Sequence, residues 1–371
     1  MPASVEKISG RALLPFEGAE NFLKSELAER LKIDSCGGFH TPTLCVAIRG
    51  INPTATPYEN NIRRRSASGF VDLPCENFGE LIYFKNFPEN SAAQNCENCD
   101  FEKNIFFARD QMLEPFLLRF ESIGEAAAAL KGVQRNWASY QFQFFRRAEL
   151  IQKKLPYINF SARDFPVKIP RSPIGLWTLL DEHTILASAK TSSFLPAGKI
   201  VFKENHVEPP SRAYLKLQEA LVLANNFFGV EFPCEGTRCF ECGAAPGGWT
   251  WVLANLGASV LAVDRAELDA RLMKNPCVEF LAHDAFTLPP EQIGKCDWVF
   301  SDVICYPERL FEWTQKWLES GLAKNMICTI KMQGGINWDA VEKFAAIENS
   351  RVVHLNYNKH ELTWIHCGTA A

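Results

Sequence analysis

From about residue 205 onward, the chain alternates short apolar segments with longer amphipathic ones. The apolar segments include RCFECG, SVLAVD, CDWVFSD and MICTIKM, and stretches such as ERLFEWTQKWLESGL separate them. This alternation is typical of a largely parallel sheet with helices on both faces. Ligands of such folds bind at the carboxyl ends of the strands, so the residues that follow each strand are the first candidates for function.

Four of these predicted strands end in a glycine-rich turn or in a carboxylate. The first runs into Gly243-Ala-Ala-Pro-Gly-Gly-Trp249, and Asp264, Asp284 and Asp302 end the next three. Glycines let the backbone approach a ligand closely, and the start of a helix offers free N–H groups. Carboxylates at this edge can accept hydrogen bonds from ribose hydroxyls or from an adenine amino group. The pattern predicts a nucleotide-like ligand, and by spacing alone it also admits an NAD-dependent dehydrogenase.

Composition places the chain among ordinary folded proteins. Its 371 residues are 47% hydrophobic and 22% charged, which suggests two or three domains. No apolar run is long enough to span a membrane, and the first residues do not resemble a signal peptide, so we expect a cytoplasmic protein. The thirteen cysteines favour reduced thiols over a disulfide framework. Cys96 and Cys99 form a CxxC pair without a matching second pair, so we expect no metal site.

Charge is distributed unevenly along the chain. The formal net charge is −4, yet residues 131–171 carry nine basic and two acidic side chains. Aromatic residues interleave with these charges, a combination that RNA-binding surfaces use for phosphates and unpaired bases. The alternative is a solvated face over an aromatic core, with QFQFF as a strand whose rings point inward. The candidate RNA-binding residues are Arg135, Arg146, Arg147, Lys153 and Lys154.

The N-terminal half reads as two α+β units. We expect the first over residues 1–104, with loops at 50–75 and 88–100 that are rich in turn-forming residues. The basic run Arg63–Arg65 lies in the first of these loops and is interpreted as a surface segment. The second unit spans residues 105–204, and KENHVEPPSR links it to the third unit at 205–371.

The motifs of the third unit resemble a known family. GAAPGGW, preceded by SRAYLKLQE and followed by SDV and IKMQGG, is similar to the FtsJ-like S-adenosylmethionine-dependent RNA 2′-O-ribose methyltransferases. The resemblance implies an α/β fold of the Rossmann-like type with a seven-stranded, mostly parallel sheet. It places a Lys-Asp-Lys-Glu catalytic tetrad on Lys216, Asp302, Lys331 and Glu361. It implies S-adenosyl-L-methionine as cofactor, bound by Gly243, Ala244, Pro246, Gly247, Gly248, Trp249, Asp264, Asp284 and Asp302.

The family resemblance also assigns roles to the tetrad. A ribose 2′-hydroxyl is a poor nucleophile until a base removes its proton, and a lysine can act as that base only in its uncharged form. Lys331 is the expected general base, because Lys216 and the sulfonium of the cofactor would disfavour a further positive charge. Asp302 would orient Lys331, and Glu361 would position the lysines or the ribose. No metal is required in this scheme.

A narrower resemblance concerns most of the chain. TSSFLPAGKIVFKENHVEPPSRAYLKLQEA and NIFFARDQ resemble the bacterial 23S ribosomal RNA ribose methyltransferases that modify a cytidine. It implies a ferredoxin-like subdomain and an RNA-binding THUMP domain before the catalytic one. Two features depart from the family pattern, namely Glu241 before the glycine turn and ICYP after Asp302. Alternative functions are the same chemistry on transfer RNA or a messenger RNA cap, and a non-catalytic RNA-binding assembly protein.

Overall fold

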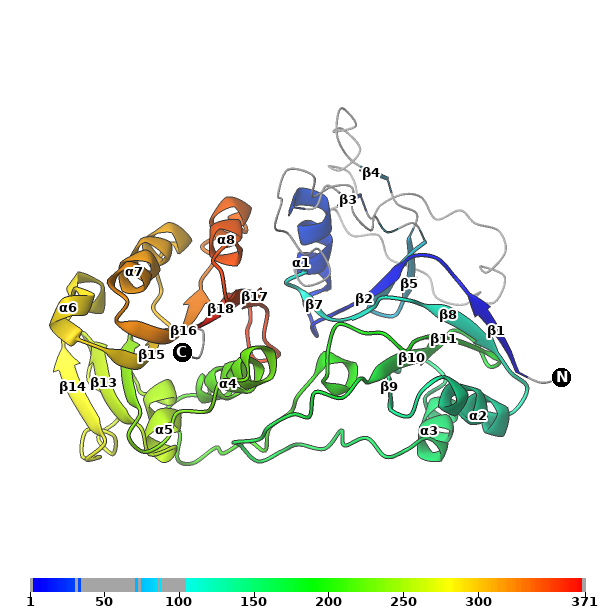
Figure 1. The fold of residues 1–371 in the computed structure, drawn as a ribbon, viewed down its shortest axis with the longest axis horizontal. Coiled ribbons are helices and arrows are strands. Elements are labelled where there is room, and N and C mark those ends of the chain that lie inside the picture. The colour runs from blue at the N-terminus through cyan, green and yellow to red at the C-terminus, as the bar shows by residue number, and fades with distance from the viewer. Residues whose placement is uncertain are drawn as a thin grey trace.

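The computed structural model describes residues 3–30, 33–34, 71–72, 75–85, 87 and 105–368. Cys96, Cys99 and Arg63–Arg65 lie outside the described residues, as do the predicted loops at 50–75 and 88–100 apart from residues 71–72 and 75. Figure 1 shows two parts of the molecule. The large sheet and its helices form the left part of the view, and two smaller sheets form the right part. Extended segments join the two parts along the lower edge of that view.

The large sheet has seven strands in the order β14-β13-β12-β15-β16-β18-β17. Neighbouring strands from β14 to β16 are parallel, whereas β18 is antiparallel to both β16 and β17. This confirms the prediction of a seven-stranded, mostly parallel sheet. The strands are β12 (Arg238–Cys242), β13 (Ser259–Asp264), β14 (Val278–Ala282), β15 (Cys296–Ser301), β16 (Ala323–Ile330), β17 (Ser350–Val353) and β18 (Leu362–Cys367).

Helices cover both faces of this sheet. On one face, α4 (Tyr214–Phe228) and α5 (Gly248–Asn255) pack together against the sheet. On the other lie α6 (Pro290–Ile293), α7 (Pro307–Ser320) and α8 (Trp338–Ala345). In α7, Leu310, Trp313 and Trp317 recur at helical spacing and are buried, which fixes the face that meets the sheet.

Two smaller sheets make up the rest of the described chain. One has the order β5-β6-β2-β7 and the other β1-β8-β11-β10-β9, with β3 and β4 forming a separate pair. Strand β1 precedes residue 104 but belongs to the five-stranded sheet, whose other strands follow that residue. Strand β7 follows residue 104 but belongs to the four-stranded sheet, whose other strands precede it. The strands are β1 (Ser4–Lys7), β2 (Arg11–Pro15), β3 (Ile33–Asp34), β4 (Val71–Asp72), β5 (Cys75–Phe78), β6 (Leu81–Phe84), β7 (Ala108–Met112), β8 (Phe116–Arg119), β9 (Trp137–Ser139), β10 (Gly175–Leu179) and β11 (Thr184–Ser188).

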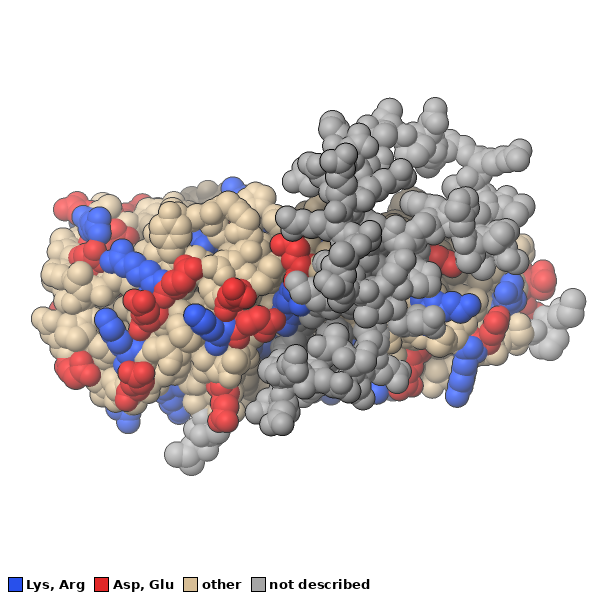
Figure 2. Space-filling model, turned by 90° about the horizontal axis from the view of Figure 1, so that it is seen from above, with Lys and Arg blue, Asp and Glu red and all other residues tan. Residues whose placement is uncertain are grey.

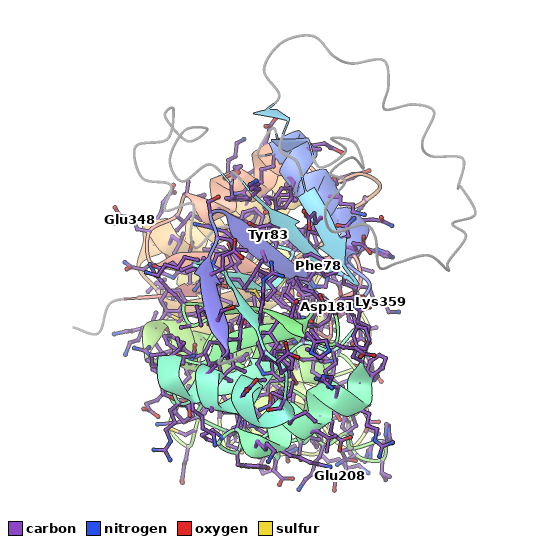
Figure 3. All side chains as sticks on the ribbon, turned by 90° about the vertical axis from the view of Figure 1, so that its right-hand side faces the viewer. Phe78, Tyr83, Asp181, Glu208, Glu348 and Lys359 are labelled. Carbon is purple, nitrogen blue, oxygen red and sulfur yellow. The ribbon has the colours of Figure 1, made fainter. Side chains whose placement is uncertain are left out.

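Three helices accompany these sheets. Helix α1 (Glu20–Ser25) continues into a π-helical turn at Glu26–Arg30, and α2 (Ile123–Val133) starts with a capping box at Ser122. Helix α3 spans Phe145–Lys154. In Figure 3, α2 and α3 lie at the bottom of the molecule, below the sheet that carries Phe78 and Tyr83.

The prediction that QFQFF forms a strand with inward-pointing rings is wrong. Strand β9 ends at Ser139, and the chain turns before α3 begins at Phe145. Helix α3 buries Ala148 and Ile151, whose spacing of three residues follows the helical period of FRRAELIQKK rather than the alternation before it. The rings of Phe144 and Phe145 are consequently 37% and 60% exposed.

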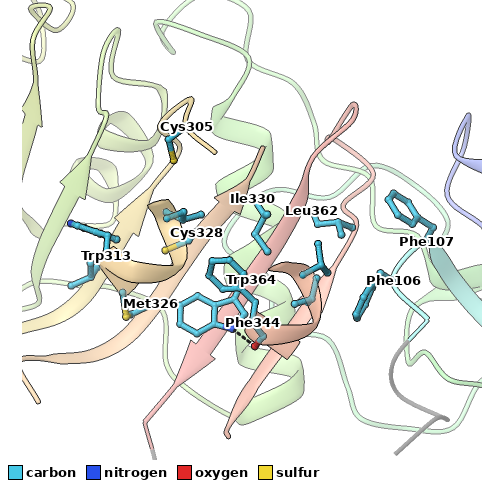
Figure 4. Close-up of a cluster of buried hydrophobic side chains, with 14 of the residues drawn as sticks. Phe106, Phe107, Cys305, Trp313, Met326, Cys328, Ile330, Phe344, Leu362 and Trp364 are labelled. Atoms are coloured by element: carbon cyan, nitrogen blue, oxygen red, sulfur yellow. Dashed lines mark hydrogen bonds between the residues drawn. The ribbon is translucent and has the colours of Figure 1, made fainter. Parts of the chain in front are cut away.

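The N-terminal unit and the large sheet share one hydrophobic core. Phe106 and Phe107 precede β7, and they cluster with Ile330 and Leu362 of the large sheet and with Phe344 of α8 (Figure 4). The backbone N–H of His354 donates to the carbonyl of Phe106 at 3.0 Å, and the ring of His354 lies 5.3 Å from that of Phe107. Packing of this kind fixes the N-terminal unit against the edge of the sheet.

Candidate functional site

The glycine turn joins β12 to α5 at the carboxyl edge of the sheet. Gly243 and Gly247 have φ angles of +78° and +109°, which residues with a side chain rarely adopt. A Cβ atom added at Gly243 would lie 2.3 Å from Val303, the residue after Asp302, and at Gly248 it would lie 2.3 Å from the Ser211 hydroxyl. The glycines thus allow three segments of the chain to meet at one point.

Asp264 and Asp284 lie on neighbouring strand ends and hold the backbone around them. The Asp264 carboxylate accepts hydrogen bonds from the N–H groups of Ala245 and Ala266, both at 3.0 Å. Asp284 follows β14 and caps a short 3-10 turn (Ala285–Thr287), where it forms an ion pair with Arg265 at 2.5 Å. That hydrogen bond from Arg265 holds the pKa of Asp284 below its usual range.

Trp249 and Glu241 lie beneath the turn, in the interior. The indole of Trp249 is buried, and its N–H donates to the carbonyl of Ala213 at 3.0 Å, just before α4 begins. Glu241 is 2% exposed and accepts a hydrogen bond from Thr250 at 2.6 Å. Burial raises the pKa of Glu241 to about 8, so its carboxyl group is mainly protonated at neutral pH.

The four residues of the predicted tetrad come together although they lie on four different elements. Lys216 is in the first turn of α4, Asp302 directly follows β15, Lys331 directly follows β16, and Glu361 directly precedes β18. The Lys331 ammonium lies 2.8 Å from the Asp302 carboxylate, which is 4.0 Å from the ammonium of Lys216. Lys216 also forms an ion pair with Glu361. The result is a chain of alternating charges whose side chains are between 11% and 20% exposed.

Glu361 is ionised within this chain of charges. Burial raises the pKa of its carboxyl group, but the hydrogen bond and positive charge of Lys216 more than offset this, so the pKa lies below its ordinary value. Its second oxygen accepts the backbone N–H of His360 at 3.0 Å. Both oxygens therefore have a partner, which orients the carboxylate toward Lys216.

A further residue that sequence reasoning missed supports this arrangement. Glu219 lies one helical turn after Lys216 on α4 and is 1% exposed. Its carboxylate accepts hydrogen bonds from the backbone N–H groups of Asn356 and Tyr357 and from the Asn356 side chain. Glu219 thereby ties α4 to the loop that leads to Glu361. The only signal in the sequence was the position of Glu219, three residues after Lys216 in SRAYLKLQE.

The ICYP segment after Asp302 presents two apolar side chains to solvent. Ile304 is 78% exposed and Tyr306 is 63% exposed, while Cys305 between them is buried. Two exposed apolar groups therefore follow Asp302 closely in the chain. Seen from above, the described part of the molecule shows acidic and basic side chains interspersed rather than gathered by sign (Figure 2).

The predicted RNA-binding residues lie on and beside α3, and the structure divides them. Arg147 packs over the ring of Phe120 at 5.4 Å, and Lys153 pairs with Glu149 at 2.6 Å. Arg135, Arg146 and Lys154 are exposed, and none of them has an ion-pair partner within the described part of the chain. Three of the five candidates thus remain available to a ligand.

Comparisons with known proteins show what the third unit is similar to. Residues 209–344 match the family model described as FtsJ-like methyltransferase. This part of the chain is similar to the FtsJ-like methyltransferases. It is 32% identical over 206 residues to ribosomal RNA large subunit methyltransferase M of Hahella chejuensis, covering 51% of this chain and 52% of that protein. It is 35% identical over 191 residues to the protein of the same name from Xylella fastidiosa, covering 50% and 53%.

The alignments with these relatives cover only part of each protein. The chain spans about half the length of the curated relatives it matches. Among solved structures, a fibrillarin pre-rRNA processing protein of Methanococcus jannaschii matches with a TM-score of 0.31 and 16% identity over 42% of this chain and 75% of that one. A score this low carries no argument.

Two features are absent from the described residues, namely a membrane-spanning helix and a metal-binding group. None of their helices is both long and apolar enough to cross a membrane. No group of three or more His, Cys, Asp or Glu side chains is placed among them to hold a metal ion.

Proposed function

We propose that this chain transfers a methyl group from S-adenosylmethionine to a ribose 2′-hydroxyl of ribosomal RNA. The observation that carries the proposal is the meeting of Lys216, Asp302, Lys331 and Glu361 at the carboxyl edge of the sheet. Four charged side chains from four separate elements converge beside the glycine turn of an FtsJ-like domain. Such convergence of titratable groups in one place is typical of an active site.

The residues around the glycine turn suit S-adenosylmethionine by their chemistry. Asp264, Asp284 and Asp302 follow three parallel strands that lie on either side of the turn. Carboxylates in this position complement ribose hydroxyls, an amino group and a sulfonium cation. When bound, the cofactor supplies a methyl group on a positively charged sulfur. We assign its binding to Gly243, Ala244, Pro246, Gly247, Gly248, Asp264, Asp284 and Asp302, with Trp249 holding the turn from below.

Lys331 acts as the general base in this proposal. In its uncharged form, its amine accepts the proton of the ribose 2′-hydroxyl as the oxygen attacks the methyl carbon in line with the departing sulfur. Asp302, at 2.8 Å, orients the amine and stabilises the ammonium that forms. Lys216, which is paired with Glu361, is assigned to hold the ribose hydroxyl.

The substrate proposal follows from the relatives and from the N-terminal units. The curated relatives are named for methylation of the large-subunit ribosomal RNA. We propose a cytidine of 23S ribosomal RNA as the target, with a ferredoxin-like unit over residues 1–104, a THUMP-like RNA-binding unit over 105–204 and the catalytic unit over 205–371. Tyr306, exposed beside Asp302, has the aromatic ring needed to stack on the target base.

The test is transfer of labelled methyl from S-adenosylmethionine into total RNA of cells that lack the protein. After nuclease digestion, we expect 2′-O-methylcytidine in large-subunit RNA. Label in another ribose, or in transfer RNA, would support the proposed reaction but contradict the proposed substrate. Absence of label despite tight cofactor binding would favour the RNA-binding assembly protein.

A further inference from the structure

A cavity of about 690 Å3 lies in the five-stranded unit, apart from the tetrad. Its walls come from three places: the end of β9, the segment between α3 and Arg163, and the chain around a short 3-10 turn at Pro196–Gly198. No tetrad or glycine-turn residue lines it. Its volume falls within the range of roughly 300–1,000 Å3 that small-molecule and cofactor sites occupy.

The cavity carries an excess of positive charge. Arg109, Lys153, Arg163 and Lys199 line it, and Glu149 is the single acidic residue among the described residues of the lining. Lys153 is paired with Glu149 and Lys199 with Glu17. The two arginines have no carboxylate partner in the described ranges, since Arg163 donates only to the carbonyl of Asn159 at 3.3 Å. Two guanidinium groups are thus left for an anion.

Arg109 is the more constrained of these two groups. Its Nε atom is buried and has no hydrogen-bond partner among the described residues. Burial lowers the pKa of Arg109, which means that the surrounding carboxylates do not fully compensate its charge. The buried Nε atom is out of reach of a ligand, so Arg109 contributes to the cavity through its positive charge, which attracts a phosphate.

Aromatic rings at the cavity suit a planar ligand. Tyr157 is 82% exposed and Phe160 is 47% exposed, and both line the cavity. Exposed rings beside cationic groups are the combination that holds the bases and phosphates of single-stranded nucleic acid. An apolar floor from Leu195, Ala197 and Ile200 completes the lining.

The wall of the cavity is connected to the catalytic helix. Ile200 and Val201 line the cavity, and the chain continues to Phe202, whose N–H donates to the Tyr357 hydroxyl at 3.1 Å. Three residues later, the N–H of Asn205 donates to the hydroxyl of Tyr214, the first residue of α4. The segment that forms this wall therefore continues to the first residue of the helix that carries Lys216.

We propose that this cavity binds one nucleotide of a single-stranded RNA segment, with its phosphate on Arg109 and Arg163 and its base against Tyr157 and Phe160. The proposal rests on the proposed function in that RNA is the source of the nucleotide. It adds a second contact site on the substrate, away from the ribose that is methylated. A free nucleoside monophosphate offers the same chemistry and is the other source to be tested.

The experiment measures fluorescence anisotropy of a labelled single-stranded oligoribonucleotide of about ten nucleotides, a length within the known range of such sites. The full chain is used without cofactor. We expect Tyr157→Ala and Arg163→Gln each to weaken binding about tenfold or more, as loss of a stacking or phosphate contact does. Arg119→Gln, at an exposed arginine of β8 outside the cavity, serves as the matched control and should change binding less than twofold. Arg109→Gln is a third variant, and it is interpreted only if its circular dichroism spectrum matches that of the parent.

Competition with cytidine monophosphate separates the two sources. Failure of millimolar nucleotide to displace the oligonucleotide supports an RNA strand, whereas displacement that Arg163→Gln abolishes supports a free nucleotide. Unchanged binding in both Tyr157→Ala and Arg163→Gln overturns the cavity site. Because methyl transfer is assayed separately, loss of the catalytic proposal would leave these binding results intact, and an active enzyme with insensitive cavity variants would refute the cavity alone.

Discussion

Each lysine of the tetrad has a carboxylate beside it, but the two pairs differ. Lys216 is held between Glu361 and Asp302, whereas Lys331 contacts Asp302 alone. Lys331 therefore has one acidic neighbour to hold its amine, whereas Lys216 is held by two. This difference is the structural reason for placing the base at Lys331 rather than at Lys216.

We expect Lys331→Ala to abolish methyl transfer while cofactor affinity stays within a few-fold of the parent, because the amine acts on the ribose proton and not on the cofactor. Calorimetric titration with S-adenosylmethionine and a labelled-methyl assay measure the two quantities. Lys316→Ala, at an exposed lysine of α7, is the control and should retain full activity. A parallel loss of cofactor binding in Lys331→Ala would contradict the assignment.

The buried carboxyl of Glu241 gives the protein a pH-dependent stability. Between its ordinary value of 4.5 and its folded-state pKa of about 8, Glu241 is protonated in the folded state and ionised in the unfolded state. Stability therefore declines as the pH rises through this window, by up to about 1.4 kcal/mol per pH unit from this group.

Glu241→Gln should remove that contribution, because an amide does not titrate but still accepts the hydrogen bond of Thr250. Urea unfolding at several pH values between 5 and 8.5 checks the difference between parent and variant. We expect the parent to lose stability relative to the variant as the pH rises. Glu231→Gln, at an exposed glutamate, should run parallel to the parent. A constant difference between the Glu241→Gln curve and the parent curve would argue against a protonated Glu241.

At the scale of elements, Glu219 connects α4 to the loop after β17 through hydrogen bonds. We expect Glu219→Ala to lower kcat about tenfold with the cofactor KM unchanged, because the loop that orients Glu361 loses its acceptor. Two partly buried N–H groups would also lose their partner, at a cost of up to about 1–3 kcal/mol each.

Steady-state kinetics and thermal melts distinguish positioning from folding in this case. Glu219→Gln retains one acceptor oxygen and should recover part of kcat, whereas an equal loss of kcat in both variants, tracking their stability, would reduce Glu219 to a structural role. Glu231→Ala, on the exposed segment after α4, should alter neither kinetic constant.

The sequence predicted best where pattern and position coincide. The strands of the large sheet are apolar runs closed by Gly243, Asp264 or Asp302, so both their existence and the residues at their carboxyl ends could be predicted directly. Local alternation misled at QFQFF, because five residues fit a strand while the next ten carry the stronger helical period of α3. The side chain of Trp249 could not be placed from the motif, since its indole N–H donates to the carbonyl of Ala213, which lies far away in the sequence, just before α4.

Hydrophobic cores shared between the N-terminal half and the large sheet hold the molecule together, in addition to the linking segments. Phe16 and Phe107 contact His354, and Arg30 forms an ion pair with Glu342 of α8. On the other side, Phe202 and Ile169 pack with the residues of α4. These contacts link residues far apart in the sequence, which is why local patterns divided the chain more sharply than its packing does.

A single cooperative unfolding transition follows from these shared cores. We expect Phe107→Ala to cost about 3–5 kcal/mol and to lower the melting temperature seen by far-UV circular dichroism and by tryptophan fluorescence together. Trp313, Trp317 and Trp364 report on the large sheet, while the substitution lies in the N-terminal unit. Phe145→Ala, at an exposed ring of α3, is the control. A tryptophan transition that stays at the parent temperature would show that the units melt independently.

The position of β18 between β16 and β17 has a consequence for synthesis on the ribosome. Strand β17 emerges before the strand that joins it to the sheet, and the apolar edge of β16 stays open until residues 362–367 are made. Glu361 enters the site with that same strand. A nascent chain stalled before this point would display an unpaired strand edge to its neighbours and to chaperones, and it would lack one carboxylate of the site. Completion of the sheet and completion of the active site are thus the same late event of translation.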